Sequence, residues 1–408
     1  MPRSPYAKEQ SIPFWLACVG LAFQNQPMTT PKFIELARAL IAAPSVSSVN
    51  PEWDMGNQQV IEHLSGWLEP LGFQIEILPV PGCDGKFNLI ASRGSGPEGL
   101  VISGHTDTVP FDEGKWNRDP LKISESHGRL YGLGSCDMKG FFAVVIEALK
   151  QVPLERLKQP LTIIATADEE STMCGAKALV ELHRQLGRHA IIGEPTGLKP
   201  VRMHKGISME SVRLTGRSGH SSDPALGVNA LEGMHKVIGE VMAWRSELQQ
   251  RYHNPAFAVP VPTLNLGHIH GGDNPNRICG QCELQFDLRP LPGMQLGELR
   301  GELSQRLERL LAGSELQWQL EPVFDGIPAL ETPAQAAIVR AVESLTGQSA
   351  GAVAFGTEGP YLNSMGMETV ICGPGHIAQA HQPDEYLPLE HIAPAIKLIE
   401  SLIGRFCL

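Results

Sequence analysis

The sequence has few charged residues, no excess of positive charge and no long apolar run. Charged residues make up 19% of its 408 residues and hydrophobic residues 42%, so the chain can bury a core and is not disordered. The formal net charge of −11 argues against a surface that binds nucleic-acid phosphates, because such a surface needs a local excess of Lys and Arg. No stretch approaches the roughly 20 apolar residues of a membrane-spanning helix. We therefore expect neither a nucleic acid nor a membrane as a partner.

The eight cysteines are scattered along the chain. Because a disulfide framework is typical of small secreted domains, we expect reduced thiols and a cytoplasmic protein. Cys279 and Cys282 form a Cys-x-x-Cys pair without a second such pair, and we interpret them as strand residues rather than as a zinc or redox site.

The first 27 residues are set apart from the rest. The apolar run from Ile12 to Phe23 has the length of a signal-peptide core, but Pro13 interrupts its start and no small-residue cleavage site follows. We favour a loose tail or an over-extended gene start over secretion, and we expect this segment to lie outside the fold. Thr30 and Pro31 then fit the N-cap and the first position of a helix.

Helical periodicity alternates with short apolar runs in most of the chain. The expected helices cover residues 31–43, 58–71, 138–151, 333–346 and 391–406. The expected strands cover residues 73–80, 87–91, 100–103, 161–167, 190–192 and 369–372. This alternation favours an α/β fold with a mostly parallel sheet covered on both faces. We expect residues 28–202 and 323–408 to form this catalytic domain.

The middle of the chain has a different pattern. Residues 203–214 fit one strand, and further elements follow as a helix over 228–250, strands over 263–272 and 278–288, a helix over 296–311 and a strand over 316–322. The order β-α-β-β-α-β is that of a ferredoxin-like α+β sandwich. We therefore expect residues 203–322 to form an inserted domain of that type.

Four polar clusters and a late histidine supply the candidates for chemistry. Three clusters follow the carboxyl ends of predicted strands, where open α/β sheets place their ligand crevice, and one precedes a predicted helix. The candidates are His105, Asp107, Asp137, Glu169, Glu170, Glu194 and His381. So many carboxylates in one crevice would raise each other's pKa unless cations lay between them. Histidine and carboxylate ligands without thiolates suit zinc, and also cobalt or manganese.

The charges of these groups favour two metal ions. Two divalent ions are neutralised by three carboxylate ligands and one bridging hydroxide, which leaves Glu169 free beside Glu170 as a general base. Asp107 lies two residues after His105 and could orient its imidazole. Taken singly, such a residue is more often a helix cap or a solvated loop residue, and only the joint placement of the clusters predicts a metal hydrolase.

Five motifs occur in a fixed order: Gly-His-Thr-Asp-Thr-Val-Pro at 104–110, Gly-Ser-Cys-Asp-Met-Lys-Gly at 134–140, Asp-Glu-Glu at 168–170, Gly-Glu-Pro-Thr at 193–196 and the late His381. On these motifs the sequence resembles the dinuclear zinc deacylases and exopeptidases of the aminoacylase and carboxypeptidase type, from about residue 30 to the C-terminus. Leu133 departs from that pattern, which has a glycine there. The resemblance implies two Zn²⁺ ions per subunit, which Co²⁺ can replace.

The resemblance also implies the metal ligands. His105 and Glu194 would bind one ion, Glu170 and His381 the other, and Asp137 would bridge them. The hydroxide between the ions would attack the substrate carbonyl.

The remaining catalytic roles follow from the same resemblance. Glu169 would take the proton of the attacking water, and Asp107 would support His105. His220 would stabilise the oxyanion from the partner subunit of a homodimer formed through the inserted domain. Without the resemblance, His220 fits a turn histidine in a Gly/Ser-rich loop.

Further stretches at 105–112, 264–272, 276–279 and 379–386 resemble the branch of the family that hydrolyses N2-acetyl-L-ornithine to L-ornithine and acetate, in arginine biosynthesis. Arg277 is the candidate for the substrate α-carboxylate, with Asn276 and Asn265 as weaker candidates, and Glu358 for its δ-ammonium. The alternatives are a succinyl-diaminopimelate desuccinylase, an aminoacylase or a small-dipeptide carboxypeptidase. A catalytically silent binding protein on the same fold would be expected to lack a ligand or the base.

Overall fold

The computed structural model describes residues 32–112 and 114–408. The expected tail over residues 1–27, together with Thr30 and Pro31, therefore lies outside the described residues. The first described helix, α1 (Phe33–Ala42), begins after Lys32, whose backbone N–H donates to the Glu35 side chain at 3.1 Å. None of the helices in these two ranges is long and apolar enough to cross a membrane.

The largest sheet has four parallel strands at its centre and mixed pairing at its edges. Its strands, in spatial order, are β1 (Gln74–Pro79), β2 (Phe87–Arg93), β6 (Leu161–Thr166), β3 (Leu100–His105), β7 (His189–Pro195), β15 (Glu368–Gly373), β8 (Val201–His204) and β13 (Leu330–Glu331), with β14 (Gly351–Val353) also paired to β8. Strands β6, β3, β7 and β15 pair in parallel, whereas the β1–β2, β2–β6, β15–β8 and β8–β13 pairs are antiparallel. The expected α/β fold with a mostly parallel central sheet is confirmed.

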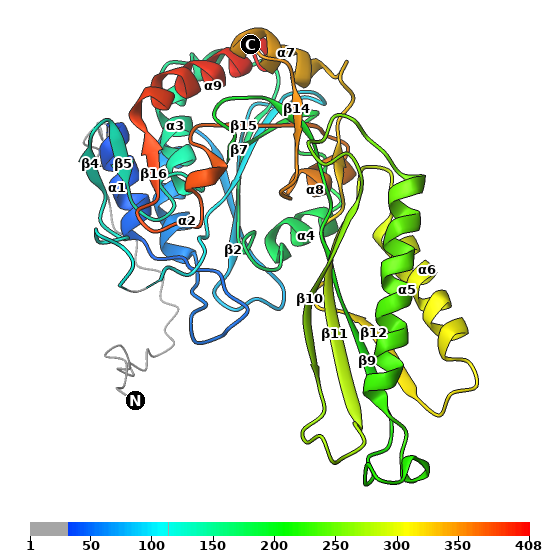
Figure 1. Ribbon diagram of the computed structural model, residues 1–408. Coiled ribbons are helices and arrows are strands. Elements are labelled where there is room, and N and C mark those ends of the chain that lie inside the picture. The colour runs from blue at the N-terminus through cyan, green and yellow to red at the C-terminus, as the bar shows by residue number, and fades with distance from the viewer. Residues whose placement is uncertain (1–31, 113) are drawn as a thin grey trace. The chain divides into compact units, whose positions relative to one another are not determined.

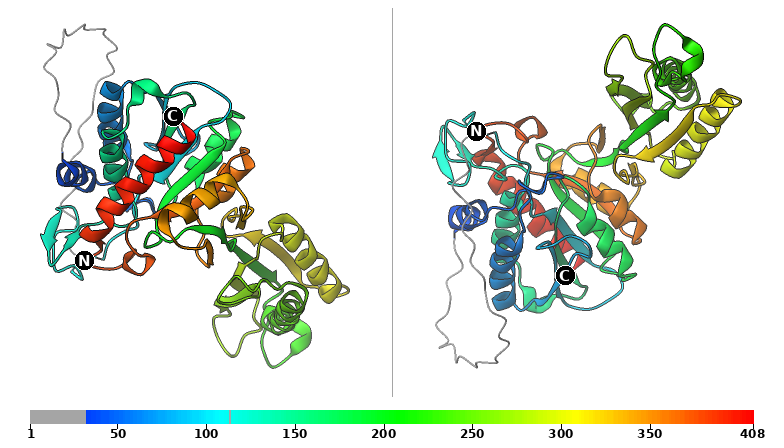
Figure 2. Two further views of the ribbon diagram at one scale, coloured as in Figure 1. Left: turned by 90° about the horizontal axis from the view of Figure 1, so that it is seen from above. Right: turned by 90° about the horizontal axis from the view of Figure 1, so that it is seen from below.

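Helices cover both faces of this sheet because successive apolar residues of its strands point to opposite sides. Ile102 packs into one core with helices α1, α2 (Gln58–Leu68), α3 (Lys139–Leu149), α7 (Ala337–Thr346) and α9 (Ile392–Phe406). Its neighbour Val101 packs into the other core with α4 (Cys174–Glu181) and α8 (Gly359–Ser364). Figure 2 shows α9 beside α3 and α7.

A second, antiparallel sheet has its own hydrophobic core. Its order is β10 (Thr263–Gly271), β11 (Gln281–Arg289), β9 (Ser208–Thr215) and β12 (Gln317–Pro322). Helices α5 (Ala230–Arg251) and α6 (Leu296–Leu311) pack against it (Figure 1), and Trp244 and Leu307 lie fully buried between them and the strands. This is the expected β-α-β-β-α-β unit, while its expected boundaries at residues 203 and 322 remain a prediction.

The prediction of one strand over residues 203–214 is wrong. The structure has two strands there, β8 in the large sheet and β9 in the antiparallel sheet. The chain changes sheets at Gly206, whose backbone N–H donates to Pro290 and where a Cβ would lie 2.8 Å from the carbonyl oxygen of Ile327. The sequence pattern is strand-like on both sides of Gly206, so it does not show that the chain passes from one sheet to another.

A third sheet was not expected, nor were several short helices, although the one at Glu69–Leu71 falls within the helix expected over residues 58–71. The sheet consists of β16 (Tyr386–Pro388), β5 (Arg129–Tyr131) and β4 (Ser124–Ser126). The single-turn 3₁₀ helices are Glu69–Leu71, Leu154–Arg156, Pro224–Leu226, Ile377–Gln379 and Leu389–His391. Elements of three residues are too short to show a hydrophobic period. The third sheet matters for the site because β16 follows the loop that carries His381.

Candidate metal centre

Three neighbouring parallel strands deliver their polar clusters to one edge of the large sheet. His105 is the last residue of β3, Glu169 and Glu170 follow β6, and Glu194 lies near the end of β7. Because β6, β3 and β7 are adjacent and parallel, their carboxyl ends meet at the same edge. Asp137 reaches this edge from the segment that precedes α3.

The side chains of these clusters touch one another. His105 Nε2 lies 3.1 Å from Asp137 Oδ1 and 3.8 Å from Glu194 Oε1. His381 Nε2 lies 3.5 Å from Asp137 Oδ2 and 3.0 Å from Glu170 Oε2. Asp137 thus stands between the two histidines with one oxygen toward each.

Burial makes this cluster electrostatically unfavourable without a cation. His105, Asp137 and Glu194 are all at most 5% exposed. Burial raises the pKa of Glu194 well above its ordinary value, and the Asp137 carboxylate adds to the rise. Burial likewise raises the pKa of Glu169 well above its usual range, with further contributions from Glu194 and Glu170. Carboxylates that repel each other in this way are suited to divalent cations.

The pKa values of the two histidines are raised as well, because their partners are carboxylates. Burial lowers the pKa of His105, but the hydrogen bond to Asp137 and the charge of Glu194 outweigh it and raise the pKa well above the ordinary value. Hydrogen bonds to Asp137 and Glu170 raise the pKa of His381 to about 10. Without a metal ion, the positive charge of the protonated imidazoles therefore balances part of the negative charge of the carboxylates. The donor set of two imidazoles and several carboxylates, without a thiolate, fits zinc or cobalt.

Asp107 holds the loop that carries the two glutamates. Its carboxylate accepts the backbone N–H groups of Glu169 at 3.2 Å and Glu170 at 3.0 Å. The imidazole Nδ1 of His105 lies nearer to the backbone oxygen of Asp107, at 3.1 Å, than to its carboxylate, at 3.6 Å. Asp107 thus contacts His105, mainly through its backbone oxygen. Its side chain instead holds the loop of Glu169 and Glu170, a role that the sequence analysis did not predict.

Glu385 is a supporting residue that the sequence analysis missed. Its buried carboxylate accepts the backbone N–H groups of Gly134, Cys136 and Asp137 at 3.1, 2.8 and 3.0 Å. These bonds fix the segment that presents Asp137 to the histidines. The only available signal was the position of Glu385 four residues after His381.

Asp168, the first residue of the Asp-Glu-Glu motif, turns the chain after β6. It has a φ of 64° and lies 4% exposed. Its carboxylate accepts hydrogen bonds from Ser47, Ser171 and Thr172 and lies 3.2 Å from the ammonium group of Lys86. A non-glycine residue in the left-handed region is retained where its surroundings hold it, often near a functional site.

The other predicted residues divide into two groups. His220, Arg277, Asn276 and Asn265 belong to the antiparallel sheet and its loops, and within the described part of the chain no hydrogen bond or ion pair joins their side chains to the metal-centre cluster. His220 Nδ1 lies 2.7 Å from Ser222 Oγ, and Arg277 pairs with Asp273.

Glu358 is the one remaining substrate candidate, and unlike the other four it lies close to the metal-centre cluster. It directly precedes α8 and is 1% exposed, and its Oε1 atom has no hydrogen-bond partner among the described residues. Burial raises its pKa to about 7, and its charge contributes to the raised pKa of Glu169. The structure therefore brings Glu358 to the metal centre, but its burial does not favour direct contact with a substrate ammonium group.

A cavity of ≈ 500 Å³ is lined by residues that neighbour the cluster in sequence but by none of the cluster residues themselves. Its lining includes Pro195 and Thr196, which directly follow Glu194, and Gln379, two positions before His381. This cavity could not be predicted from the sequence, because its lining comes from three separate segments, residues 195–201, 349–355 and 376–379.

The comparisons with known proteins agree with this geometry. Residues 101–405 match the peptidase family M20/M25/M40. The chain is 52% identical over 377 residues to an acetylornithine deacetylase of Edwardsiella ictaluri, which covers 92% of this chain and 98% of the relative. It is 49% identical to an acetylornithine deacetylase of Pasteurella multocida over the same shares of the two chains.

Solved structures share the fold at low identity. The aminopeptidase PepT of Bacillus cereus has a TM-score of 0.71 at 19% identity, covering 91% of this chain and 97% of its own. The metallo-carboxypeptidase Sso-CP2 of Sulfolobus solfataricus has a TM-score of 0.71 at 17% identity, covering 92% and 99%. A dinuclear metal binding peptidase of Bacillus subtilis has a TM-score of 0.63 at 18% identity, covering 91% and 97%. The family match, the near relatives and the shared fold together establish that this chain belongs to peptidase family M20/M25/M40.

Proposed function

We propose that the chain is a metal-dependent amidohydrolase that converts N2-acetyl-L-ornithine and water to L-ornithine and acetate. The observation that carries the proposal is the cluster in which the buried Asp137 lies between the buried His105 and the half-exposed His381, with Glu169 close by. The substrate assignment is supported by relatives named acetylornithine deacetylase that match over nearly their whole length. This reaction would place the chain in arginine biosynthesis, in the cytoplasm.

Five side chains would hold two divalent ions. We propose His105 and Glu194 for one ion, Glu170 and His381 for the other, and Asp137 for both, since each of its oxygens faces a different histidine. Zn²⁺ suits this donor set, and Co²⁺ would substitute for it. When bound, such a pair of ions polarises the acyl carbonyl and makes a water molecule nucleophilic at neutral pH.

Glu169 would move the proton. Glu169 is half-buried, and its backbone N–H donates to the carboxylate of Asp107, which fixes the loop on which it stands. We propose that its carboxylate accepts a proton from the attacking water and then gives it to the leaving amine nitrogen, as a general acid–base group does. The amide C–N bond breaks as that nitrogen is protonated.

His220 and Arg277 would complete the site from the antiparallel unit, which consists of the antiparallel sheet with helices α5 and α6 and their connecting loops. The backbones of these two residues pair in an antiparallel bridge, so a donor for the oxyanion and a cation for the α-carboxylate lie side by side. Both side chains are exposed or half-exposed and so are free to meet a substrate. We propose that they act on the metal centre of a partner subunit, in a homodimer formed through residues 203–322, with Asn276 and Asn265 as further substrate contacts.

The test is a comparison of substrates on the zinc-loaded protein. We expect a kcat/KM above about 10⁴ M⁻¹s⁻¹ on N2-acetyl-L-ornithine, well above the values on N-succinyl-diaminopimelate and N-acetyl-methionine. Glu169→Gln serves as the control for a contaminating hydrolase, because it should lose activity on every substrate. A value on acetylornithine equal to or below either comparison substrate would contradict the assignment.

A further inference from the structure

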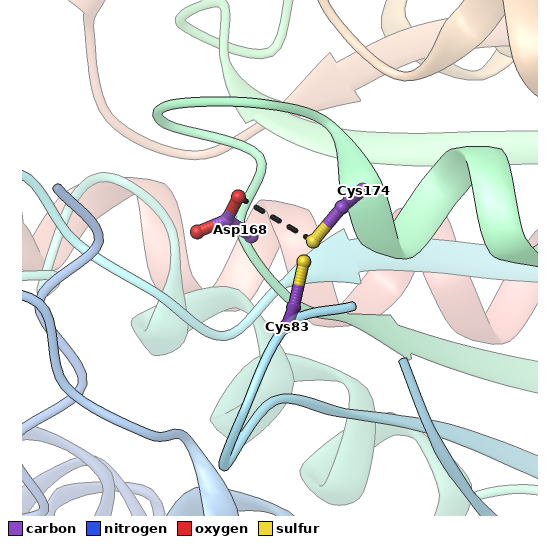
Figure 3. Close-up of side chains that lie close together, drawn as sticks. All are labelled: Cys83, Asp168 and Cys174. Carbon is purple, nitrogen blue, oxygen red and sulfur yellow. Dashed lines mark hydrogen bonds between the residues drawn. The ribbon is translucent and has the colours of Figure 1, made fainter. Parts of the chain in front are cut away.

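Two cysteines that take no part in the proposed reaction meet beside the metal-binding loop. Cys83 lies in the connection between β1 and β2, and Cys174 is the first residue of α4. Their Sγ atoms and a carboxylate oxygen of Asp168 all lie within 4.8 Å of one another. Figure 3 shows the two sulfur atoms facing each other, with Cys174 hydrogen bonded to Asp168 Oδ2 at 3.4 Å.

The two segments are held in this position by independent contacts. Lys86, three residues after Cys83, places its ammonium group 3.2 Å from Asp168 Oδ1 and 2.7 Å from Asp54 Oδ1. The backbone N–H of Lys86 also donates to the carbonyl of Cys83 at 3.2 Å. The connection that carries Cys83 is therefore anchored to the same aspartate that Cys174 touches.

A metal ion is not the occupant that these groups favour. Asp168 already accepts hydrogen bonds from Ser47, Ser171 and Thr172 and pairs with Lys86, so its carboxylate would have to give up these partners to bind an ion. Within residues 32–112 and 114–408, no further histidine, cysteine or acidic side chain belongs to the group. Two thiols remain, and two adjacent thiols form a disulfide on oxidation.

We propose that Cys83 and Cys174 form a reversible disulfide when a peroxide oxidises them, and that this bridge distorts the adjoining loop that carries Glu169 and Glu170. The inference goes beyond the proposed function, because formation of the bridge needs no substrate. Both cysteines are half-buried, so a molecule the size of a peroxide can reach them.

The reaction balances in two steps. The thiolate of Cys83 attacks one peroxide oxygen, the O–O bond breaks, and a sulfenic acid and one water form. The sulfur of Cys174 then attacks the sulfur of Cys83 and displaces the hydroxyl group as a second water. Each thiol gives up one proton, both sulfurs are oxidised by one electron, and the two peroxide oxygens are reduced to water.

The order of these steps follows from the surroundings of Cys174. Burial raises the pKa of the Cys174 thiol, and its contacts with Cys83 and Asp168 raise it further. The thiolate is the reactive form. The Cys174 thiol, which also donates to Asp168 Oδ2 at 3.4 Å, is thus held in its protonated form, and the proposal assigns the first oxidation to Cys83.

The bridge would act on the loop through a short path. A disulfide requires the sulfur atoms to approach to about 2.05 Å, and it removes the Cys174 thiol hydrogen that Asp168 accepts. The backbone N–H groups of Thr172 and Met173 donate to the carbonyl of Asp168, so the start of α4 and the loop move together. A displacement of about 1 Å at a catalytic group can cost about 100-fold in rate.

The experiment treats the metal-loaded full chain with hydrogen peroxide and digests it without reduction. We expect a Cys83 peptide linked to a Cys174 peptide, two hydrogens lighter than their sum, which dithiothreitol separates. We also expect kcat to fall at least tenfold and to recover on reduction. Cys83→Ser and Cys174→Ala should keep their activity through the same treatment, whereas Cys282→Ala, which removes a buried thiol elsewhere, should respond like the wild type.

Three results would overturn the proposal. The first is the absence of the linked peptide at peroxide concentrations that oxidise other cysteines. The second is a bridge that forms in full while kcat stays unchanged. The third is the loss of one zinc equivalent in Cys174→Ala, which would assign the thiols to a metal ion. The peptide analysis remains decisive even if acetylornithine is not the substrate.

Discussion

The carboxylate of Asp107 accepts the backbone N–H of Glu170 at 3.0 Å, although the two residues are 63 positions apart in the sequence. Asp107 follows β3 and Glu170 follows β6, and these parallel neighbours bring the two loops together. The position of Glu170, a proposed metal ligand, is thus set by the side chain of Asp107 in the loop that follows the neighbouring strand.

Asp107→Asn should therefore weaken metal binding. The amide nitrogen that replaces one carboxylate oxygen cannot accept a hydrogen bond, so one of the backbone N–H groups of Glu169 and Glu170 loses its acceptor. Residues that support metal ligands typically change metal affinity 10–100-fold. We expect a loss of that size in a zinc competition titration. Asp112→Asn is the matched control, since Asp112 is exposed and pairs with Lys115 at the surface. Equal affinities for wild type and Asp107→Asn would refute the supporting role.

Glu169→Gln should separate proton transfer from metal binding. Loss of a general base typically costs 10²–10⁴ in turnover, and we expect kcat to fall by that range while zinc content stays at the wild-type level. Asp137→Ala gives the contrast, because Asp137 contacts both histidines and its removal should empty the site of both ions. Near-normal turnover in Glu169→Gln would remove Glu169 from its role, and retention of both ions in Asp137→Ala would show that Asp137 is not the bridge.

The metal-free protein should lose stability as the pH rises. The pKa of His381 is about 10 in the fold, against an ordinary value of 6.5, so the folded state binds the proton more tightly than the unfolded state. The resulting stabilisation is complete below pH 6.5 and disappears as the pH rises through about 10. Chemical unfolding of the metal-free wild type and of His381→Ala from pH 6 to 10 measures this difference. A constant difference between the two proteins across that range would contradict the assignment.

The same pKa predicts that metal binding expels protons. At pH 7.5 the imidazole of His381 is protonated without a metal, whereas a metal ligand must be neutral. Zinc titration by calorimetry in two buffers of different ionisation enthalpy should show proton release. His381→Ala should release fewer protons than the wild type.

The placement of His220 can be tested by mixing two inactive variants. His220→Ala should lower kcat about 100-fold without loss of metal, as expected when one oxyanion donor is removed. If His220 serves the partner's site, a mixture of His220→Ala and Glu169→Gln subunits should recover about a quarter of wild-type activity, because half of the dimers are mixed and one of their two sites is complete. No recovery in a mixture shown to exchange subunits would place His220 on its own subunit's site.

The sequence predicted the parts of the site that follow strands. The apolar run at 100–103 ends in a polar cluster, and a parallel sheet must bring that cluster to the edge where β6 and β7 end. Such neighbouring clusters can be predicted, because the hydrophobic pattern indicates the strands and the α/β fold class indicates that they run parallel.

The supporting contacts could not be predicted in this way. Glu385 bonds to the Asp137 segment 248 residues earlier, and nothing local to either residue indicates the other. Glu358 was expected at the substrate, but its burial depends on the packing of α8 against the sheet. The change of sheet at Gly206 escaped for a similar reason, since both sides of it have strand-like composition.

The position of β15 in the large sheet has a consequence for synthesis on the ribosome. β15 pairs in parallel with β7 and joins it to β8, yet it is made after all six elements of the antiparallel unit. While the chain grows, the edge of β7 therefore has no partner strand at the place β15 will take, and His381 has not yet been made. The antiparallel unit can complete its own core during this interval, so the metal centre is one of the last parts of the nascent protein to assemble.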